Sequence, residues 1–402
     1  YYTIYMASII YVTKEIERAL GIEPIGDYYI ITNKTKYSIS IHEQYPNNIW
    51  LIDKGEILDT FELLMLPEVQ EIISKHNASI LVFKNTIHIE SLCSEKKWKL
   101  LNPSSELSEK IENKISQTKW LGDLSSLLPP HNITLVKNIG IDILDQKKVI
   151  IIQWSHGHTG NGTLLISNND ELETLKEKFP HREAKITDYI KGPMFTVNIV
   201  VTHNIILLGN ISYQITGMMP FTDNPFSTIG NDWAVTHTIL SENHIKKIEN
   251  IGEIIGQKMQ SENWRGLFGI DIIYDEERDE LKLIEINARQ PASTTYESHL
   301  QSKSKIHGVQ GITTFEAHIN ALIEKSVPVS LIEINDGAQI LQRVTKNTKK
   351  IDIEKLVTAG YKVIEYSNTK ENADLLRIQS ERGIMETHNK FNNRGKEIIS
   401  LI

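Results

Sequence analysis

The feature that most constrains this chain is a pair of apolar strands within residues 267–288, joined by a strongly polar turn centred on Arg278. This pattern is typical of a β-hairpin. If the pairing is symmetric about Arg278, Asp271 faces Glu285 directly. Directly opposed side chains lie roughly 4.5–5.5 Å apart at Cβ, so two unpaired carboxylates there repel each other. The hairpin therefore predicts a positive group beside this pair.

Side chains alternate between the two faces of a strand, so we expect Asn287 and Arg289 on the face that carries Asp271 and Glu285. Magnesium takes hard oxygen ligands and commonly uses one or two carboxylates together with substrate phosphates. We therefore predict that Asp271, Glu285 and Asn287 are Mg²⁺ ligands. The alternatives are a solvated charged face, or an Asp271 side chain paired with an arginine.

A glycine-rich segment supplies Gly157, Gly160 and Gly162. Glycine lets backbone N–H groups approach an anion closely. The segment joins two strand-like pieces, whereas a dinucleotide-binding loop or a P-loop opens a helix. We interpret it as a flap over phosphates, with a plain hairpin turn as the alternative.

The chain divides by pattern into four regions. The first alternates strand-like pieces with helix-like ones, including an amphipathic piece at residues 9–20, and predicts an α/β domain with a partly parallel sheet. A serine-capped helix at 106–121 opens the centre of the chain. The irregular segment 217–233 is either an acceptor or lid loop, or an ordinary surface excursion. The predicted domains are residues 1–105 (α/β), 106–187 (small subdomain with the flap), 188–330 (subdomain with the hairpin) and 331–402 (small α+β).

Composition limits the partners. The 43 Lys and Arg residues against 51 Asp and Glu residues give a net charge of −8, which argues against nucleic acid. The one cysteine, Cys93, excludes an internal disulfide and a cysteine metal cluster. No apolar run reaches the length of a membrane span, and we expect a cytoplasmic protein.

Several motifs occur in one order: Lys114, the glycine segment, the stretch 187–193 and the acidic hairpin. In that order the chain resembles the ATP-grasp superfamily, which includes carboxylate–amine ligases and the ATP-binding part of the carbamoyl-phosphate synthase large chain. The match covers roughly residues 105–300, and the hairpin is its most specific part.

The resemblance implies an ATP-grasp fold, in which two α+β subdomains clamp ATP. An N-terminal α/β domain precedes these subdomains, and a small C-terminal α+β domain follows them. It implies ATP and Mg²⁺ as cofactors, with two Mg²⁺ ions expected and Mn²⁺ also suitable. Arg289 resembles a catalytic residue that steadies a transferring phosphate or a substrate carboxylate. The positions implied for ATP binding are Lys114, Gln153, Gly157, Gly160, Gly162, Thr187, Asp188 and Ile190.

Two positions depart from the family pattern. Gln153 stands where a second ATP lysine is expected, and Met194 stands where an acidic residue usually meets the ribose. A glutamine can donate a hydrogen bond but carries no charge. Weaker nucleotide binding is therefore expected from these two positions.

The function implied is a ligase that uses ATP to activate a carboxylate as an acyl phosphate and joins it to an amine. Its partners would be small-molecule carboxylates and amines, with no nucleic acid and no membrane, and a dimer is compatible with the sequence. One alternative is a regulatory nucleotide-binding protein that has lost catalysis. Another is a carboxylase-like enzyme that activates bicarbonate.

Overall fold

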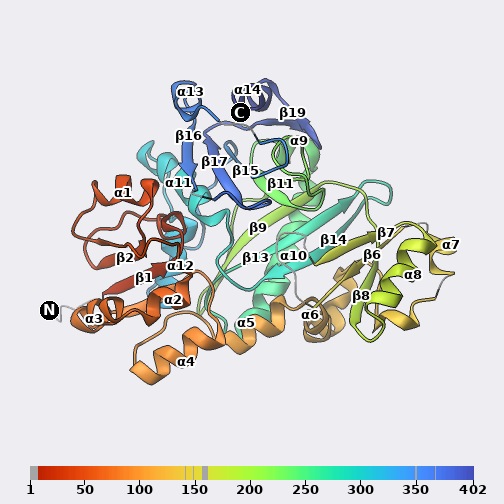
Figure 1. Cartoon of the computed structure of the whole chain (residues 1–402), viewed down its shortest axis with the longest axis horizontal. Helices are drawn as coiled ribbons and strands as arrows, with labels where there is room; N and C mark the ends of the chain where they lie inside the picture. The colour runs from red at the N-terminus through yellow and green to blue at the C-terminus, as the bar shows by residue number, and fades with distance from the viewer. Residues whose placement is uncertain (1–7, 141, 148, 156–161, 349–350, 367) are drawn as a thin grey trace.

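The structure is a computed structural model, and it describes residues 8–402 except 141, 148, 156–161, 349–350 and 367. Within these residues the strands form three sheets of four or more strands and one two-stranded ribbon. Figure 1 places the N-terminal region (red) on the left, the small sheet of β5–β8 (yellow-green) on the right, and the largest sheet between them. The predicted combination of α/β and α+β regions is confirmed.

The N-terminal region has a four-stranded parallel sheet in the order β3-β2-β1-β4. The helix-like interpretation of residues 9–20 is wrong, because this stretch forms β1 and a 3-10 turn. All five residues of β1 are buried, and a strand covered on both faces of a parallel sheet is apolar throughout instead of alternating. The elements are β1 (Ile9–Thr13), β2 (Tyr28–Asn33), α1 (Lys36–His42), β3 (Ile49–Ile52), α2 (Thr60–Met65), α3 (Pro67–His76), β4 (Ser79–Val82) and α4 (Ile87–Lys96).

Two helices occupy the stretch in which the sequence predicts one. α5 (Ser105–Glu112) ends before Asn113, whose extended backbone and side chain cap the N-terminus of α6 (Lys114–Leu121). The Asn113 Oδ1 atom accepts hydrogen bonds from the N–H groups of Ile115 and Ser116, so the break is a true helix cap. Lys114 is therefore the first residue of a helix.

The small sheet is antiparallel, in the order β5-β8-β6-β7, and α8 packs near it. On one face Ile150, Ile152, Ala184 and Ile186 join an apolar core, and the alternate residues of β6 and β8 point away from that core. The elements are β5 (His131–Leu135), α7 (Ile143–Lys147), β6 (Ile150–Gln153), β7 (Thr163–Ile166), α8 (Asn169–Lys178) and β8 (Glu183–Asp188).

The largest sheet has nine strands in the order β14-β13-β9-β11-β12-β15-β17-β16, with β10 paired to β9. Strands from beyond residue 331 continue the sheet that carries the hairpin. Part of the segment 217–233, expected to be irregular, is strand β12. The strands are β9 (Met194–Val201), β10 (Ile206–Leu208), β11 (Ser212–Thr216), β12 (Thr228–Asp232), β13 (Gly266–Asp275), β14 (Glu280–Asn287), β15 (Ala338–Arg343), β16 (Lys362–Glu365) and β17 (Asp374–Ser380).

Helices cover this sheet, and Gly252 and Gly256 bring the long helix α10 close to the side chains of β9 and β10. In the part of the chain that the structure describes, no helix is long and apolar enough to cross a membrane. The remaining elements are α9 (Thr236–Ile239), α10 (Glu242–Ser261), α11 (Thr294–Ile306), α12 (Thr314–Leu322), α13 (Ile353–Thr358), β18 (Met385–Thr387), β19 (Lys390–Phe391) and α14 (Asn393–Leu401).

Candidate functional site

The register of the β13–β14 hairpin places Asp271 directly opposite Glu285, as predicted. Asn287 pairs with Gly269 two positions further along. The register shifts by one residue just after Asp271, and a bulge of this kind re-aims side chains at functional sites. The predicted facing of the two carboxylates is confirmed.

The four predicted hairpin residues line one cavity of about 390 Å³. Its walls come from the N-terminal 3-10 turn, the inner face of the small sheet, and strands of the largest sheet from β9 to β17. The sequence predicted the hairpin residues that line this cavity. The structure adds the residues that line its other walls. The Lys, Arg, Asp and Glu residues that line it are Arg18, Lys114, Lys185, Asp188, Asp271, Glu285, Arg289, Arg343, Asp374 and Arg377.

Asp271 accepts three hydrogen bonds from neutral side chains. The hydroxyl of Thr196 (2.8 Å) and the amide of Gln214 (2.6 Å) donate to Oδ1, and the amide of Asn287 (3.1 Å) donates to Oδ2. Burial, followed by the nearby charge of Glu285, raises the pKa of Asp271 to about 6. Neutral donors thus hold the half-buried carboxylate in place.

Glu285 is paired with the predicted ATP lysine. The Nζ atom of Lys114 lies 3.0 Å from Glu285 Oε2, and the Lys114 side chain is 7% exposed. The helix cap at Asn113 and a hydrogen bond from the Lys114 N–H to the Ser155 carbonyl hold this residue at the cavity wall. A group predicted to bind phosphate therefore lies beside a predicted metal ligand.

The oxygen donors of the hairpin suit a Mg²⁺ ion that also binds substrate phosphates, and not a metal ion held by protein ligands alone. Among the described residues no group of three or more His, Cys, Asp or Glu side chains is arranged to hold a metal ion. Asp271, Glu285 and Asn287 offer two carboxylates and one amide oxygen, which is the incomplete set that Mg²⁺ completes with water and substrate phosphates.

Lys185 is a cavity residue that sequence reasoning missed. It lies on β8 opposite Gln153 of β6, is 1% exposed and lines the cavity. Burial, and then the charge of Lys114, lower the pKa of Lys185 to about 8, with Glu285 acting in the opposite direction. The sequence signal for Lys185 was its place between two apolar residues of strand 183–188. Lysine is almost never fully buried unless it is paired, so a lysine there indicates a charged partner or ligand.

Four arginines line the cavity: Arg289 lies beside the hairpin, and the other three, from the 3-10 turn, β15 and β17, form what we call the arginine end (Arg18, Arg343 and Arg377). Arg289 forms an ion pair with Glu112 and donates to Asn287 Oδ1 at 2.9 Å. Arg18 and Arg343 each keep one buried N–H nitrogen, Nη1 and Nε respectively, without a hydrogen-bond partner among the described residues. Arg377 is buried and donates from Nε to the Tyr366 hydroxyl at 3.0 Å. At this end of the cavity three guanidinium groups outnumber the one lining carboxylate, Asp374, which makes it suitable for an oxyanion.

Comparison with protein families decides the fold. A family model described as an ATP-grasp domain matches residues 111–293. The chain contains an ATP-grasp domain. The predicted resemblance is thereby confirmed, and the matched range includes Lys114, the small sheet and the hairpin.

Solved structures share the whole fold. N5-carboxyaminoimidazole synthetase from Staphylococcus aureus is 13% identical with a TM-score of 0.65, over 98% of this chain and 96% of that one. The synthase from Aspergillus clavatus with ADP and 5-aminoimidazole ribonucleotide is 14% identical with a TM-score of 0.66, over 98% and 97%.

The biotin carboxylase domain of the Hydrogenobacter thermophilus 2-oxoglutarate carboxylase, solved with MgADP and bicarbonate, is 12% identical with a TM-score of 0.64, over 94% and 86%. No curated protein matches the chain significantly in sequence. At these identities the similarity establishes the fold and not the substrate.

The other residues predicted for the ATP-grasp domain divide into three groups. Gln153, Thr187, Asp188 and Ile190 line the cavity, as does Met194. Gly162 is buried outside the cavity wall, and its carbonyl accepts a hydrogen bond from the Trp154 N–H at 3.0 Å. The predictions for Gly157 and Gly160 lie outside the described residues.

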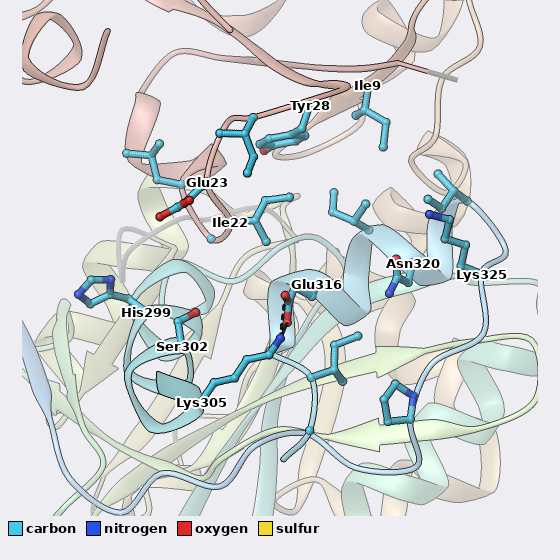
Figure 2. A pocket seen from close by; sticks show the side chains of 18 of the residues that line it. Ile9, Ile22, Glu23, Tyr28, His299, Ser302, Lys305, Glu316, Asn320 and Lys325 are labelled. Carbon is cyan, nitrogen blue, oxygen red and sulfur yellow. Dashed lines mark hydrogen bonds and ion pairs between the residues drawn. The ribbon is translucent and has the colours of Figure 1, made fainter. Parts of the chain in front are cut away.

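A second cavity, of about 860 Å³, lies between the N-terminal region and helices α11 and α12 (Figure 2). Seven of the 21 residues that line it are isoleucines. Charged side chains line it as well, and the Lys305 ammonium lies 3.2 Å from the Glu316 carboxylate. None of the residues predicted for ATP or metal binding lines this cavity, so the smaller cavity of the ATP-grasp domain is the candidate site.

Proposed function

We propose that the protein is an ATP- and Mg²⁺-dependent ligase that activates a small carboxylic acid as an acyl phosphate and joins it to an amine. The observation that carries the proposal is the opposed pair Asp271 and Glu285, which shares one cavity with Lys114 and Lys185. Two carboxylates beside two ammonium groups are the arrangement expected for a metal bound to a polyphosphate.

In this proposal Asp271, Glu285 and Asn287 hold Mg²⁺, which neutralises charge on the nucleotide phosphates when bound. Thr187 to Ile190 line the place for adenine, and Lys114 releases Glu285 to contact a phosphate. The ADP-bound fold relatives support a nucleotide at this place. The number of metal ions and the use of Mn²⁺ are part of the same proposal.

The reaction proceeds in two displacements. A carboxylate oxygen of the acid attacks the γ-phosphorus, the bond to the β,γ-bridging oxygen breaks, and ADP leaves. The amine then attacks the acyl carbon and loses a proton, a C–N bond forms, the C–O bond breaks, and phosphate leaves with one oxygen from the acid. Arg289 faces the cavity from the strand end after Asn287, where its guanidinium can hold the acid or the transferring phosphoryl group.

The arginine end favours an acidic second substrate. Arg18, Arg343 and Arg377 line the cavity from three separate parts of the chain. Arg18 and Arg343 form ion pairs with Glu15 and Asp374, and each also has one N–H donor without a hydrogen-bond partner among the described residues. An amine that also carries a carboxylate or phosphate would satisfy these donors.

Hydroxylamine offers a test in which the natural amine need not be identified. Pools of small carboxylic acids are incubated with the protein, Mg-ATP and hydroxylamine, which intercepts an acyl phosphate as a hydroxamate. The proposal predicts hydroxamate and ADP in equal amounts for at least one pool. ADP that forms equally with and without every acid, and no hydroxamate, would argue against it.

A carboxylase-like activation of bicarbonate is the second candidate. Arg289 lies two residues after Asn287 on the hairpin, and a biotin carboxylase domain with bicarbonate is among the fold relatives. Under this alternative ADP release depends on added bicarbonate and not on the acid pools.

A further inference from the structure

We propose that Lys185 and Lys114 together bind the phosphates of the nucleotide. Lys185 does so from β8, the strand next to the one that carries Gln153. This inference rests on the proposed nucleotide site and assigns one side chain within it.

The sheet register brings Lys185 to the required place. β6 and β8 are antiparallel neighbours, and Gln153 and Lys185 are directly paired. Ile152 and Ile186, one residue away on each strand, belong to the apolar core behind the sheet, so Gln153 and Lys185 project from the opposite face. Paired Cβ atoms lie roughly 4.5–5.5 Å apart, which a lysine side chain spans easily. Both side chains line the same cavity.

The surroundings of Lys185 lack an anion in contact. Among the described residues its ammonium group forms no hydrogen bond and no ion pair, although the residue is 1% exposed. Lys114, by contrast, is neutralised by Glu285 at 3.0 Å. A buried ammonium group without a partner destabilises a protein unless a ligand supplies the opposite charge.

A polyphosphate would supply the negative charge that the surroundings of the Lys185 ammonium group lack. Both lysines lie on the side of the cavity that faces the acidic hairpin, so a phosphate chain between them would meet two ammonium groups on one side and metal-bound carboxylates on the other. An adenine ring or an uncharged acid would leave Lys185 without a partner. The geometry therefore favours phosphates over the other parts of the substrates.

The test is calorimetric titration with Mg-ADP and with adenosine, since neither requires the other substrates. Lys185→Gln is expected to weaken Mg-ADP binding about 10- to 100-fold, the value of one charge-assisted hydrogen bond. Adenosine affinity should not change. Lys178→Gln, an exposed lysine outside this cavity, is the matched control.

A charge relocation tests the register directly. In the double variant Gln153→Lys/Lys185→Gln the ammonium group moves to the partner strand, and most of the lost Mg-ADP affinity should return. Thermal unfolding of Lys185→Gln should occur at or above the temperature of the parent, because an unpaired buried charge is removed.

The outcomes separate two failures. Parent protein that binds no Mg-ADP would reject the proposed nucleotide site itself. Parent protein that binds Mg-ADP, with Lys185→Gln binding equally well, would overturn the role of Lys185 alone. Equal losses of Mg-ADP and adenosine affinity, or no recovery in the double variant, would also overturn it by indicating a structural role.

Discussion

Asp271 and Glu285 are paired across β13 and β14, so two carboxylates meet inside the cavity of the ATP-grasp domain. Like charges at paired positions destabilise a sheet. Neutral donors from Thr196, Gln214 and Asn287 surround Asp271, whereas Lys114 pairs with Glu285. The Mg²⁺ ion that we propose at this pair would offset the remaining repulsion.

Removal of one carboxylate tests this relationship. Glu285→Gln should abolish the Mg²⁺ dependence of ADP binding, because one of two anionic ligands is lost. The dissociation constant of ADP is measured with Mg²⁺ and with a chelator. Glu280→Gln, an exposed change on the same strand, should retain the dependence. A Glu285→Gln variant that still needs Mg²⁺ would contradict the assignment.

Tyr366 connects the N-terminal region to the arginine end of the cavity. Its hydroxyl donates to the buried carboxylate of Glu17 and accepts from Arg377 Nε. Tyr366→Phe leaves both groups short of a partner and should lower the free energy of unfolding by about 1–3 kcal/mol. It should also raise the KM of an acidic substrate more than it lowers kcat.

The control is Tyr361→Phe, which removes a hydroxyl bonded to Glu397 outside the cavity. This variant should leave the KM unchanged. If both variants raise the KM equally, Tyr366 has no special part in holding Arg377.

His318 predicts a pH dependence of stability. Burial lowers its pKa to about 3, and Nδ1 accepts the N–H of Leu267 at the start of β13. The unfolded chain binds a proton below about pH 6.5 and the folded chain does not, so stability falls as pH decreases from 6.5 toward 3. Between about pH 7 and pH 5 this group alone costs about 2 kcal/mol.

His318→Asn keeps an acceptor and cannot titrate, so its unfolding free energy should depend less on pH by that amount. Urea unfolding of both proteins at about pH 7 and pH 5 measures the difference. Parallel pH profiles would mean that the histidine is protonated in the folded state.

Gly192 lies between β8 and β9, where the chain passes close to the backbone of the β13–β14 hairpin. A Cβ atom there would lie 1.9 Å from the Tyr274 carbonyl oxygen, which is backbone and cannot move alone. Gly192→Ala should cost about 1–3 kcal/mol of stability by overpacking. It should also weaken ADP binding, because the preceding residues 187–190, proposed to line the place for adenine, would move away from the hairpin. The substitution Lys191→Ala, at the neighbouring exposed residue, should change neither the stability nor ADP binding. Thermal unfolding with and without Mg-ADP measures both effects.

The sequence predicted local features well. The hairpin around Arg278 joins adjacent strands, so its symmetric turn was sufficient to place Asp271 opposite Glu285. The helix cap at Asn113 was missed, and a single helix was predicted, because the polar residues of 106–121 hide the break. Residues 9–20 were misjudged because a strand buried on both faces has no alternation to detect.

Tertiary features could not be read from the chain. Lys185 lies beside Gln153 only because β6 pairs with β8, and these strands are separated in sequence by β7 and α8. Arg18, Arg343 and Arg377 come together because a 3-10 turn of the N-terminal region faces two late strands of the largest sheet. No spacing in the sequence encodes such a cluster.

Oxygen tracing tests the central claim most directly. With an acid identified by hydroxamate formation, both carboxylate oxygens are labelled with ¹⁸O, the natural amine is supplied, and the released phosphate is analysed by mass spectrometry. An acyl phosphate intermediate predicts one ¹⁸O atom in each phosphate formed. Phosphate without label, released alongside ADP, would contradict the account, because the oxygen would then come from water and not from the acid.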